Sequence, residues 1–205
     1  STITIAVNDG SSDNNFDPVA NQTVSVTTTD NDVAGFTIVQ SGGSTSVAET
    51  GTTDTFTVVL NAQPASNVVL SISSADTGEA TVTSSLTVTS GNWNSAQTVT
   101  VTGVDDNLID GAQTTTITAA VIDAISDNAF DSVANQTVSA TTTDDDVAGF
   151  TLVQTSGSTS VNESGTTDTF TVVLNAQPSS DVVLSISSAD TGEATVTSLI
   201  SFTSG

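Results

Sequence analysis

Hydrophobic and polar residues alternate along many short segments of this chain. TFTVVL from Thr55 and TVTVTG from Thr98 place an apolar side chain at every second position, with Thr at most of the positions between. A period of two predicts strands that have one buried and one exposed face. Clusters of Gly, Asn, Asp and Ser separate the segments, and helical periodicity is missing. The pattern therefore predicts an all-β fold.

The stretch from residue 33 to residue 146 is predicted to contain seven antiparallel strands, at 34–41, 53–60, 68–73, 80–88, 97–103, 113–123 and 136–143. Seven short strands in a stretch of this length fit an immunoglobulin-like β-sandwich. The core is expected to contain Phe36, Phe56, Val58, Val69, Leu70, Ile72, Val82 and Ile117.

The sequence repeats itself after 114 residues. VAGFTIVQ at Val33 returns as VAGFTLVQ at Val147, and Thr52–Ser84 differs from Thr166–Ser198 at two of 33 positions. Repeats of this kind stack as similar structural units. We therefore expect three segments: the end of one repeat (1–32), a complete repeat (33–146) and the beginning of a third (147–205). Repeats that are this similar to one another are suited to a protein that spans a distance or polymerises.

The charge of the chain is extreme. It has 23 Asp and Glu but no Lys, Arg or His, which gives a formal net charge of −23. Nucleic acids and anionic membranes are normally bound through Lys and Arg, so neither is an expected partner. Cys is absent as well, so stability has to come from the core and from bound ions. The composition indicates a cationic partner.

Strand direction predicts where the acidic residues gather. Consecutive strands of such a sandwich run in opposite directions, so the loops after the first, third, fifth and seventh strands meet at one end. These loops hold Glu49, Asp76, Glu79, Asp105, Asp106, Asp110, Asp144, Asp145 and Asp146. Two like charges 4 Å apart repel by about 1 kcal/mol in water and about 4 kcal/mol at an effective dielectric of 20. Solvated loop charges remain one interpretation; a shared Ca²⁺, which accepts six to eight oxygen ligands, is the other.

The opposite end of the sandwich carries Asp127 and Asp131. In a linear array this end faces the tip of the preceding repeat, where Asp30, Asn31 and Asp32 lie. Asp127 and Asp131 are thus further candidate ligands, and a polar turn is the equal alternative.

The order of Glu49 before Gly51, then NWNSAQTVTVTGVDDNLIDG, then TTTDDD resembles the Calx-β family and the Calx-β-like repeats of large bacterial surface proteins and adhesins. The resemblance covers the whole repeat and implies a seven-stranded sandwich that binds calcium through loops at one end. The ligands it implies are Glu49, Asp105, Asp106, Asp110, Asp144, Asp145 and Asp146, and in the partial copies Asp30, Asn31, Asp32 and Glu163.

The middle loop departs from the family pattern. The family has an Asp-Gly turn followed by an Asp-Tyr pair there, whereas this chain has SADTGEATV. Asp76 and Glu79, with their copies Asp190 and Glu193, are therefore candidate ligands that the resemblance supports less than the others.

A structural role is the leading functional hypothesis. Calcium at each junction would stiffen a secreted or cell-surface array into a stalk, filament or matrix fibre, with neighbouring repeats of the same chain as partners. The alternatives are a homopolymer formed by strand exchange and an adhesion module that binds glycans or ice through Thr-rich strands. Catalysis is not expected, because Ser and Thr lack an activating His, Lys or Cys.

Overall fold

The computed structural model describes residues 1–204, which form two compact units, Ser1–Val33 and Ala34 onward. The first unit holds one hairpin of β1 (Thr2–Ile5) and β2 (Gln22–Ser25), with the 3₁₀ turn η1 (Asp9–Ser11) between them. None of the helices among the described residues has the length and apolar character that a membrane crossing requires.

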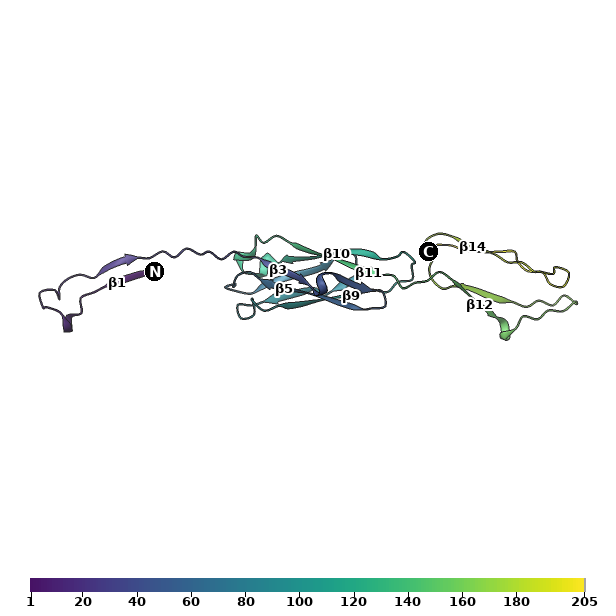
Figure 1. Cartoon of the computed structure of the whole chain (residues 1–205), viewed down its shortest axis with the longest axis horizontal. Coiled ribbons are helices and arrows are strands. Elements are labelled where there is room, and N and C mark those ends of the chain that lie inside the picture. The colour runs from purple at the N-terminus through teal and green to yellow at the C-terminus, as the bar shows by residue number, and fades with distance from the viewer. Residues whose placement is uncertain (205) are drawn as a thin grey trace. The chain divides into compact units, whose positions relative to one another are not determined.

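The predicted complete repeat forms a two-layer β-sandwich (Figure 1). Its strands are β3 (Phe36–Gln40), β4 (Thr45–Ala48), β5 (Thr53–Leu60), β6 (Val68–Ser74), β7 (Ala80–Val82), β8 (Ser85–Val88), β9 (Gln97–Gly103), β10 (Gln113–Val121) and β11 (Gln136–Thr143). One sheet has the order β4-β11-β10-β6-β8 and the other the order β3-β5-β9-β7. The 3₁₀ turns of this region are η2 (Ser41–Gly43), η3 (Asp123–Ile125) and η4 (Asn128–Phe130). The all-β sandwich expected from the sequence is confirmed.

Two of the predicted strands need correction because the chain crosses between the sheets. The path 34–48 contains β3 in one sheet and β4, which the sequence did not predict, in the other. Between them, Gly42 and Gly43 adopt φ of 64° and 86°, a region that glycine enters without steric cost. The predicted strand 80–88 divides in the same way into β7 and β8. The strand directions used to predict the acidic end are unchanged by either crossing.

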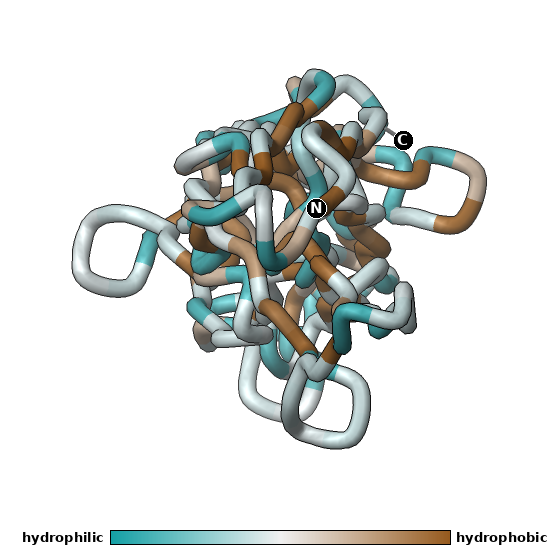
Figure 2. The backbone as a smooth tube through the Cα atoms, turned by 90° about the vertical axis from the view of Figure 1, so that its right-hand side faces the viewer, coloured by the Kyte–Doolittle hydropathy of each residue, from teal (hydrophilic) through white to brown (hydrophobic). Residues whose placement is uncertain are grey.

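The space between the sheets is filled by the alternating apolar residues. Phe56, Leu70, Val99 and Ile117 are all at most 1% exposed. Figure 2 colours the backbone by hydropathy and shows hydrophobic and hydrophilic segments interspersed along the chain. Val82 packs at the margin of this core. The prediction for Val69 is wrong: it is half-buried, and Val68 lies in the core instead.

Residues 147–204 repeat the beginning of the sandwich. Their elements are β12 (Phe150–Gln154), η5 (Thr155–Gly157), β13 (Phe170–Leu174), β14 (Val182–Ser185) and β15 (Leu199–Phe202). β12 pairs with β13, and β14 pairs with β15. Phe150 lies opposite Leu174, just as Phe36 lies opposite Leu60 114 residues earlier. The two segments thus share the same strand register.

Candidate metal centre

Four chain segments meet at one end of the sandwich, which we call the acidic tip: residues 49–52, 79, 103–111 and 142–146. Backbone hydrogen bonds connect them. The Glu49 N–H donates to the Thr143 carbonyl (3.1 Å), the Gly103 N–H to Thr52 (3.0 Å) and the Val104 N–H to Glu79 (2.9 Å). The convergence of loops expected from strand direction is therefore observed.

The tip brings Glu49, Asp106 and Asp146 together. One carboxylate oxygen from each lies within 4.8 Å of the others. Calcium–oxygen distances of 2.3–2.6 Å allow two ligands of one ion to be up to about 5 Å apart. The three carboxylates therefore form a cluster that could hold a metal ion.

Glu49 is the most unusual member of this cluster. Its side chain is only 1% exposed, and its Oε2 atom accepts no hydrogen bond. Burial, followed by the charges of Asp106, Asp144 and Asp110, raises the pKa of its carboxyl group, although the Asp145 backbone N–H acts in the opposite direction. A buried carboxylate without a partner is costly, because folding removes the water that would solvate it. A cation beside Oε2 would supply the missing interaction.

Asp146, which follows the last strand of the sandwich, has a similar environment to Glu49. Its Oδ2 atom is buried without a hydrogen-bond partner, and burial together with the neighbouring acids raises its pKa. Asp106 is half-buried, and its Oδ1 accepts a hydrogen bond from the Leu108 N–H at 2.6 Å. Two of the three carboxylates of the cluster thus have a buried oxygen without a hydrogen-bond partner.

Asp144 has a different environment. Its Oδ2 accepts hydrogen bonds from Asp110 N–H (3.1 Å) and Gly111 N–H (2.8 Å), and its Oδ1 accepts one from Asp146 N–H (2.7 Å). These backbone donors lower its pKa. The side chain therefore ties the 105–111 loop to the last strand and positions Asp106 and Asp146.

Glu79 lies at the border of the cluster, half-buried, with a buried Oε2 that lacks a hydrogen-bond partner. Burial and the charges of Asp110, Asp106 and Asp76 raise its pKa. The remaining predicted ligands of this tip, Asp76, Asp105, Asp110 and Asp145, are exposed. Their roles as ligands stay predictions.

Asp127 at the opposite end is fully engaged with the backbone. It is 8% exposed, its Oδ2 accepts from Ala65 and Ser66 N–H, and its Oδ1 accepts from Ala129 N–H (3.0 Å). These donors lower its pKa. The side chain joins two loops of the sandwich, whereas Asp131 is exposed. The structure thus gives Asp127 a complete set of protein partners.

The candidates in the partial repeats are all exposed: Asp30, Asn31, Asp32, Glu163, Asp190 and Glu193. Asp32 N–H donates to Asp30 Oδ1 (3.0 Å), which is the turn that Asp146 and Asp144 make in the complete repeat. Gly192 N–H donates to Asp190 Oδ1 as Gly78 N–H does to Asp76 Oδ1. The local turns are formed there, but the four segments of a complete tip are not brought together.

Gly103 is a residue of the site that the sequence analysis did not single out. A Cβ atom at this position would lie 2.1 Å from the Ala48 carbonyl oxygen. Only glycine allows β9 to approach the chain this closely just before Asp105 and Asp106. A glycine at the end of a strand, two residues before an acidic pair, is the signal that could have indicated it.

The raised carboxyl pKa values predict how the metal-free protein responds to pH. The folded state binds protons at Glu49, Glu79 and Asp146 more tightly than the unfolded chain does. Stability in EDTA should therefore increase as the pH falls from neutral towards the ordinary values of 4.5 and 3.8. Below that range it should decrease, because Asp127 and Asp144 have lowered pKa values.

Calorimetry in EDTA between neutral pH and about pH 4, near the reference carboxyl values, measures this response. The Glu49→Gln variant should lose part of the increase, which separates the contribution of the tip from relief of the overall net charge. A melting temperature that falls steadily on acidification would contradict the prediction.

No protein-family model matches this chain, and a search of curated proteins found no match. Among solved structures, the chain is similar to SSP-19, an MSP-domain protein like family member in Caenorhabditis elegans, with 19% identity, coverage of 49% of this chain and 92% of that one, and a TM-score of 0.33. It is also similar to domains 1–6 of the surface layer protein SbsC, with 21% identity, coverage of 91% and 24%, and a TM-score of 0.40. The E. coli chaperone DraB matches with 8% identity, coverage of 57% and 59%, and a TM-score of 0.39.

The chain thus spans 24% of the length of the SbsC structure and 59% of that of DraB. At these identities and TM-scores the likeness concerns the fold alone. The family and the function of the chain have to be argued from its own residues.

Proposed function

We propose that this chain is part of an extracellular structural array of Calx-β-like repeats, in which calcium bound at the acidic tip stiffens the chain. The observation that carries the proposal is the Glu49 carboxylate, which is 1% exposed, has an Oε2 atom without a hydrogen-bond partner and clusters with Asp106 and Asp146. The chain contains no Lys, Arg or His that could neutralise it. A cation from solution would balance this buried charge without protonation of the carboxylate.

The chemistry of the donors favours calcium. At the acidic tip all candidate ligand atoms are carboxylate oxygens, and calcium accepts six to eight oxygens in flexible geometry. Magnesium requires a near-regular octahedron and retains its water more strongly. Extracellular calcium modules have dissociation constants of about 10⁻⁴–10⁻³ M, which suits a partly exposed site outside cells.

Contacts of the 105–111 loop suggest how binding would act beyond the tip. Within the second unit, the Gln177 N–H donates to the Asn107 carbonyl (2.6 Å), and Leu108 forms a β-bridge with Gln177. The same loop carries Asp106 and is tied to the last strand by Asp144. Calcium that orders this loop would therefore also hold the start of the following repeat.

Isothermal titration of the 205-residue chain with CaCl₂ tests the proposal through Glu49→Gln. This variant keeps the shape of the side chain but removes its charge, so we expect calcium affinity to fall at least about tenfold, the equivalent of about 1.4 kcal/mol. In EDTA the variant should be at least as stable as the original chain, because an unpaired buried charge has been removed.

Asp123→Asn is the matched control, since it changes the net charge equally at an exposed position that is not among the candidate ligands. It should bind calcium like the original chain. Unchanged calcium affinity in Glu49→Gln would refute the proposed site.

A further inference from the structure

Tension along the chain enters the complete repeat at Val33 and leaves it after Asp146, because the sequence continues on both sides. Val33 leads into β3 at the end opposite the acidic tip, whereas Asp146 follows β11 at the tip. A pull on the chain therefore acts along the strands of the sandwich. The pairing of the strands next to these two points determines what resists the pull.

The pair β4–β11 connects the two points most directly. β4 follows β3 after the crossing between the sheets, and it pairs in parallel with β11 from Thr45 to Ala48. Parallel strands that are pulled at opposite ends slide along each other, so their evenly spaced hydrogen bonds carry the load together. Strands that are separated from one end lose these bonds one after another. Tension along the chain thus loads this pair in its more resistant direction.

Further hydrogen bonds hold β4 on both of its sides. Beyond its last residue, the Glu49 N–H donates to the Thr143 carbonyl (3.1 Å), and the Thr143 hydroxyl donates to the Val47 carbonyl (3.4 Å). At the opposite edge, the Ser46 N–H donates to Asp54 Oδ2 (2.9 Å). A strand of only four residues is therefore fixed to β11 and to the other sheet.

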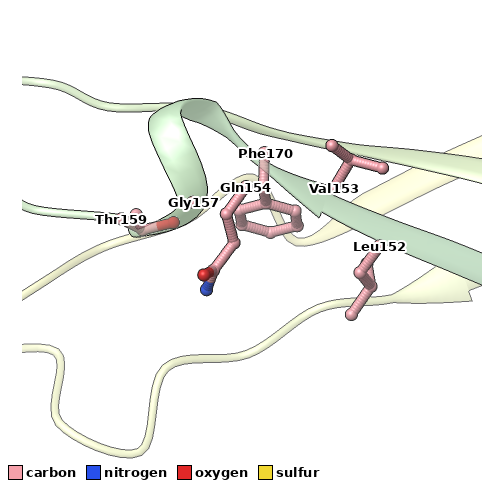
Figure 3. Close-up of a pocket in the computed structure, with 6 residues that line it drawn as sticks. All are labelled: Leu152, Val153, Gln154, Gly157, Thr159 and Phe170. Atoms are coloured by element: carbon pink, nitrogen blue, oxygen red, sulfur yellow. The ribbon is translucent and has the colours of Figure 1, made fainter.

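The next repeat fixes the corresponding segment in the same way. Residues 154–159 correspond to residues 40–45, and Figure 3 shows the turn η5 of this crossing between Gln154 and Thr159. Beyond it, the Ser160 N–H donates to Asp168 Oδ2 (2.8 Å), as Ser46 does to Asp54 114 residues earlier. The arrangement at the start of β4 is thus a property of the repeat.

The acidic cluster lies at the tip end of the β4–β11 pair. Glu49 is the first residue after β4, and Asp146 is the third residue after β11. One carboxylate oxygen of Glu49 lies within 4.8 Å of one of Asp146. An ion bound by both residues connects the two strands across the pair that slides under load, and these ligands have to separate before the strands can slide.

We propose that β4 and β11 form a mechanical clamp, which determines how long the repeat stays folded under tension, and that a cation bound by Glu49 and Asp146 strengthens it. The clamp follows from strand order and register within the complete repeat. Its strengthening rests on the proposed function, because it requires an ion at the acidic tip.

Single-molecule force spectroscopy of the 205-residue chain tests the clamp through the choice of attachment points. The chain has no Cys, so pairs of introduced cysteines define where the pulling handles attach. Val33→Cys with Val147→Cys reproduces tension along the chain, and Ser44→Cys with Val147→Cys bypasses β3. Ser44→Cys with Ser139→Cys instead separates β4 from β11 at the start of the pair. All four positions are exposed.

In EDTA the first two attachments should give equal lifetimes at a fixed load, and lifetime is the readout because forced unfolding follows the unfolding rate. The third attachment should shorten the lifetime at least about tenfold, since two hydrogen bonds fewer in the rate-limiting step already have an effect of that size. Equal lifetimes for all three attachments would overturn the clamp. A shorter lifetime on moving from Val33 to Ser44 would also overturn it, because β3–β5 would then be the resisting pair.

Calcium at about 100 times its dissociation constant should lengthen the lifetime of the Val33–Val147 attachment at least about tenfold, because binding favours the folded state about 100-fold at that concentration. Glu49→Gln should lose this lengthening. Asp123→Asn, at an exposed position outside the cluster, should keep it.

A calcium titration of the same variants separates this inference from the proposed function. If calcium binds through Glu49 but leaves the lifetime under load unchanged, the strengthening of the clamp is refuted and the proposed site stands. If no calcium binds, the proposed function and the strengthening are both refuted. The lifetimes in EDTA decide on the clamp itself in either case.

Discussion

Calcium is expected to raise the melting temperature of this protein by about 10–20 °C when free calcium is about 100 times the dissociation constant. Binding to the folded state alone contributes about 2.7 kcal/mol at that concentration. For a domain of about 100 residues, each kcal/mol shifts the melting temperature by about 4–8 °C. The effect is large because the tip contains three buried carboxylate oxygens without hydrogen-bond partners, on Glu49, Glu79 and Asp146.

Scanning calorimetry in EDTA and in increasing CaCl₂ measures this shift. Magnesium at equal concentration should produce a small shift, because Mg²⁺ demands near-ideal octahedral geometry and gives up its water reluctantly. Sodium chloride at matched ionic strength controls for screening of the net charge. If magnesium or sodium chloride gave the same rise, the stabilisation would be general charge screening and the site at Glu49 would not be its cause.

Strands with strict alternation could be predicted to the residue from the sequence. The bounds 53–60, 97–103 and 136–143 agree with β5, β9 and β11. In each of these strands one face is buried against the other sheet, so the period of two appears directly in the side chains. In these three strands the alternation of the sequence therefore matches the burial of the side chains.

The sequence pattern did not predict strands that exist because of tertiary contacts. β4 has one bulky apolar residue, Val47, and it exists because it pairs in parallel with β11 nearly 100 residues later. The misplacement of Val69 has a simpler cause. Leu70 and Ile72 point inwards, so the alternation of a strand requires Val68 and not Val69 to share their face.

The candidate site could be predicted in its location but not in the roles of its residues. Strand direction placed Glu49, Asp106 and Asp146 at one end, and the structure brings them together. No sequence pattern distinguishes an Asp that faces other carboxylates from one that accepts backbone hydrogen bonds. Asp144 and Asp127 are of the second kind, because the N–H groups of distant loops happen to converge on them.

Gly103→Ala is expected to destabilise the protein by about 3 kcal/mol and to abolish most of its calcium response. The added methyl would lie 2.1 Å from the Ala48 carbonyl oxygen and 2.8 Å from its carbon, so backbone has to move. Forcing atoms into a closely packed site costs about 1–3 kcal/mol, and rigid backbone on the other side places this substitution at the upper end.

The calcium response should decrease because the two segments that the added methyl pushes apart continue directly into the ligand residues. Ala48 directly precedes Glu49, and Gly103 precedes Asp105 and Asp106 by two and three residues. Moving β9 away from Ala48 therefore separates Asp106 from the carboxylate that it meets in the cluster. Calorimetry with and without calcium should show a lower melting temperature and a much smaller shift.

Gly91→Ala is the matched control, because a Cβ atom there meets only the Thr89 hydroxyl at an ordinary 3.8 Å. It should leave both quantities nearly unchanged. If Gly103→Ala retained the original melting temperature and calcium shift, the close approach of β9 to Ala48 would not position the site. If Gly103→Ala lowered the melting temperature but left its shift with calcium unchanged, Gly103 would matter for folding and not for the position of Asp106 relative to Glu49.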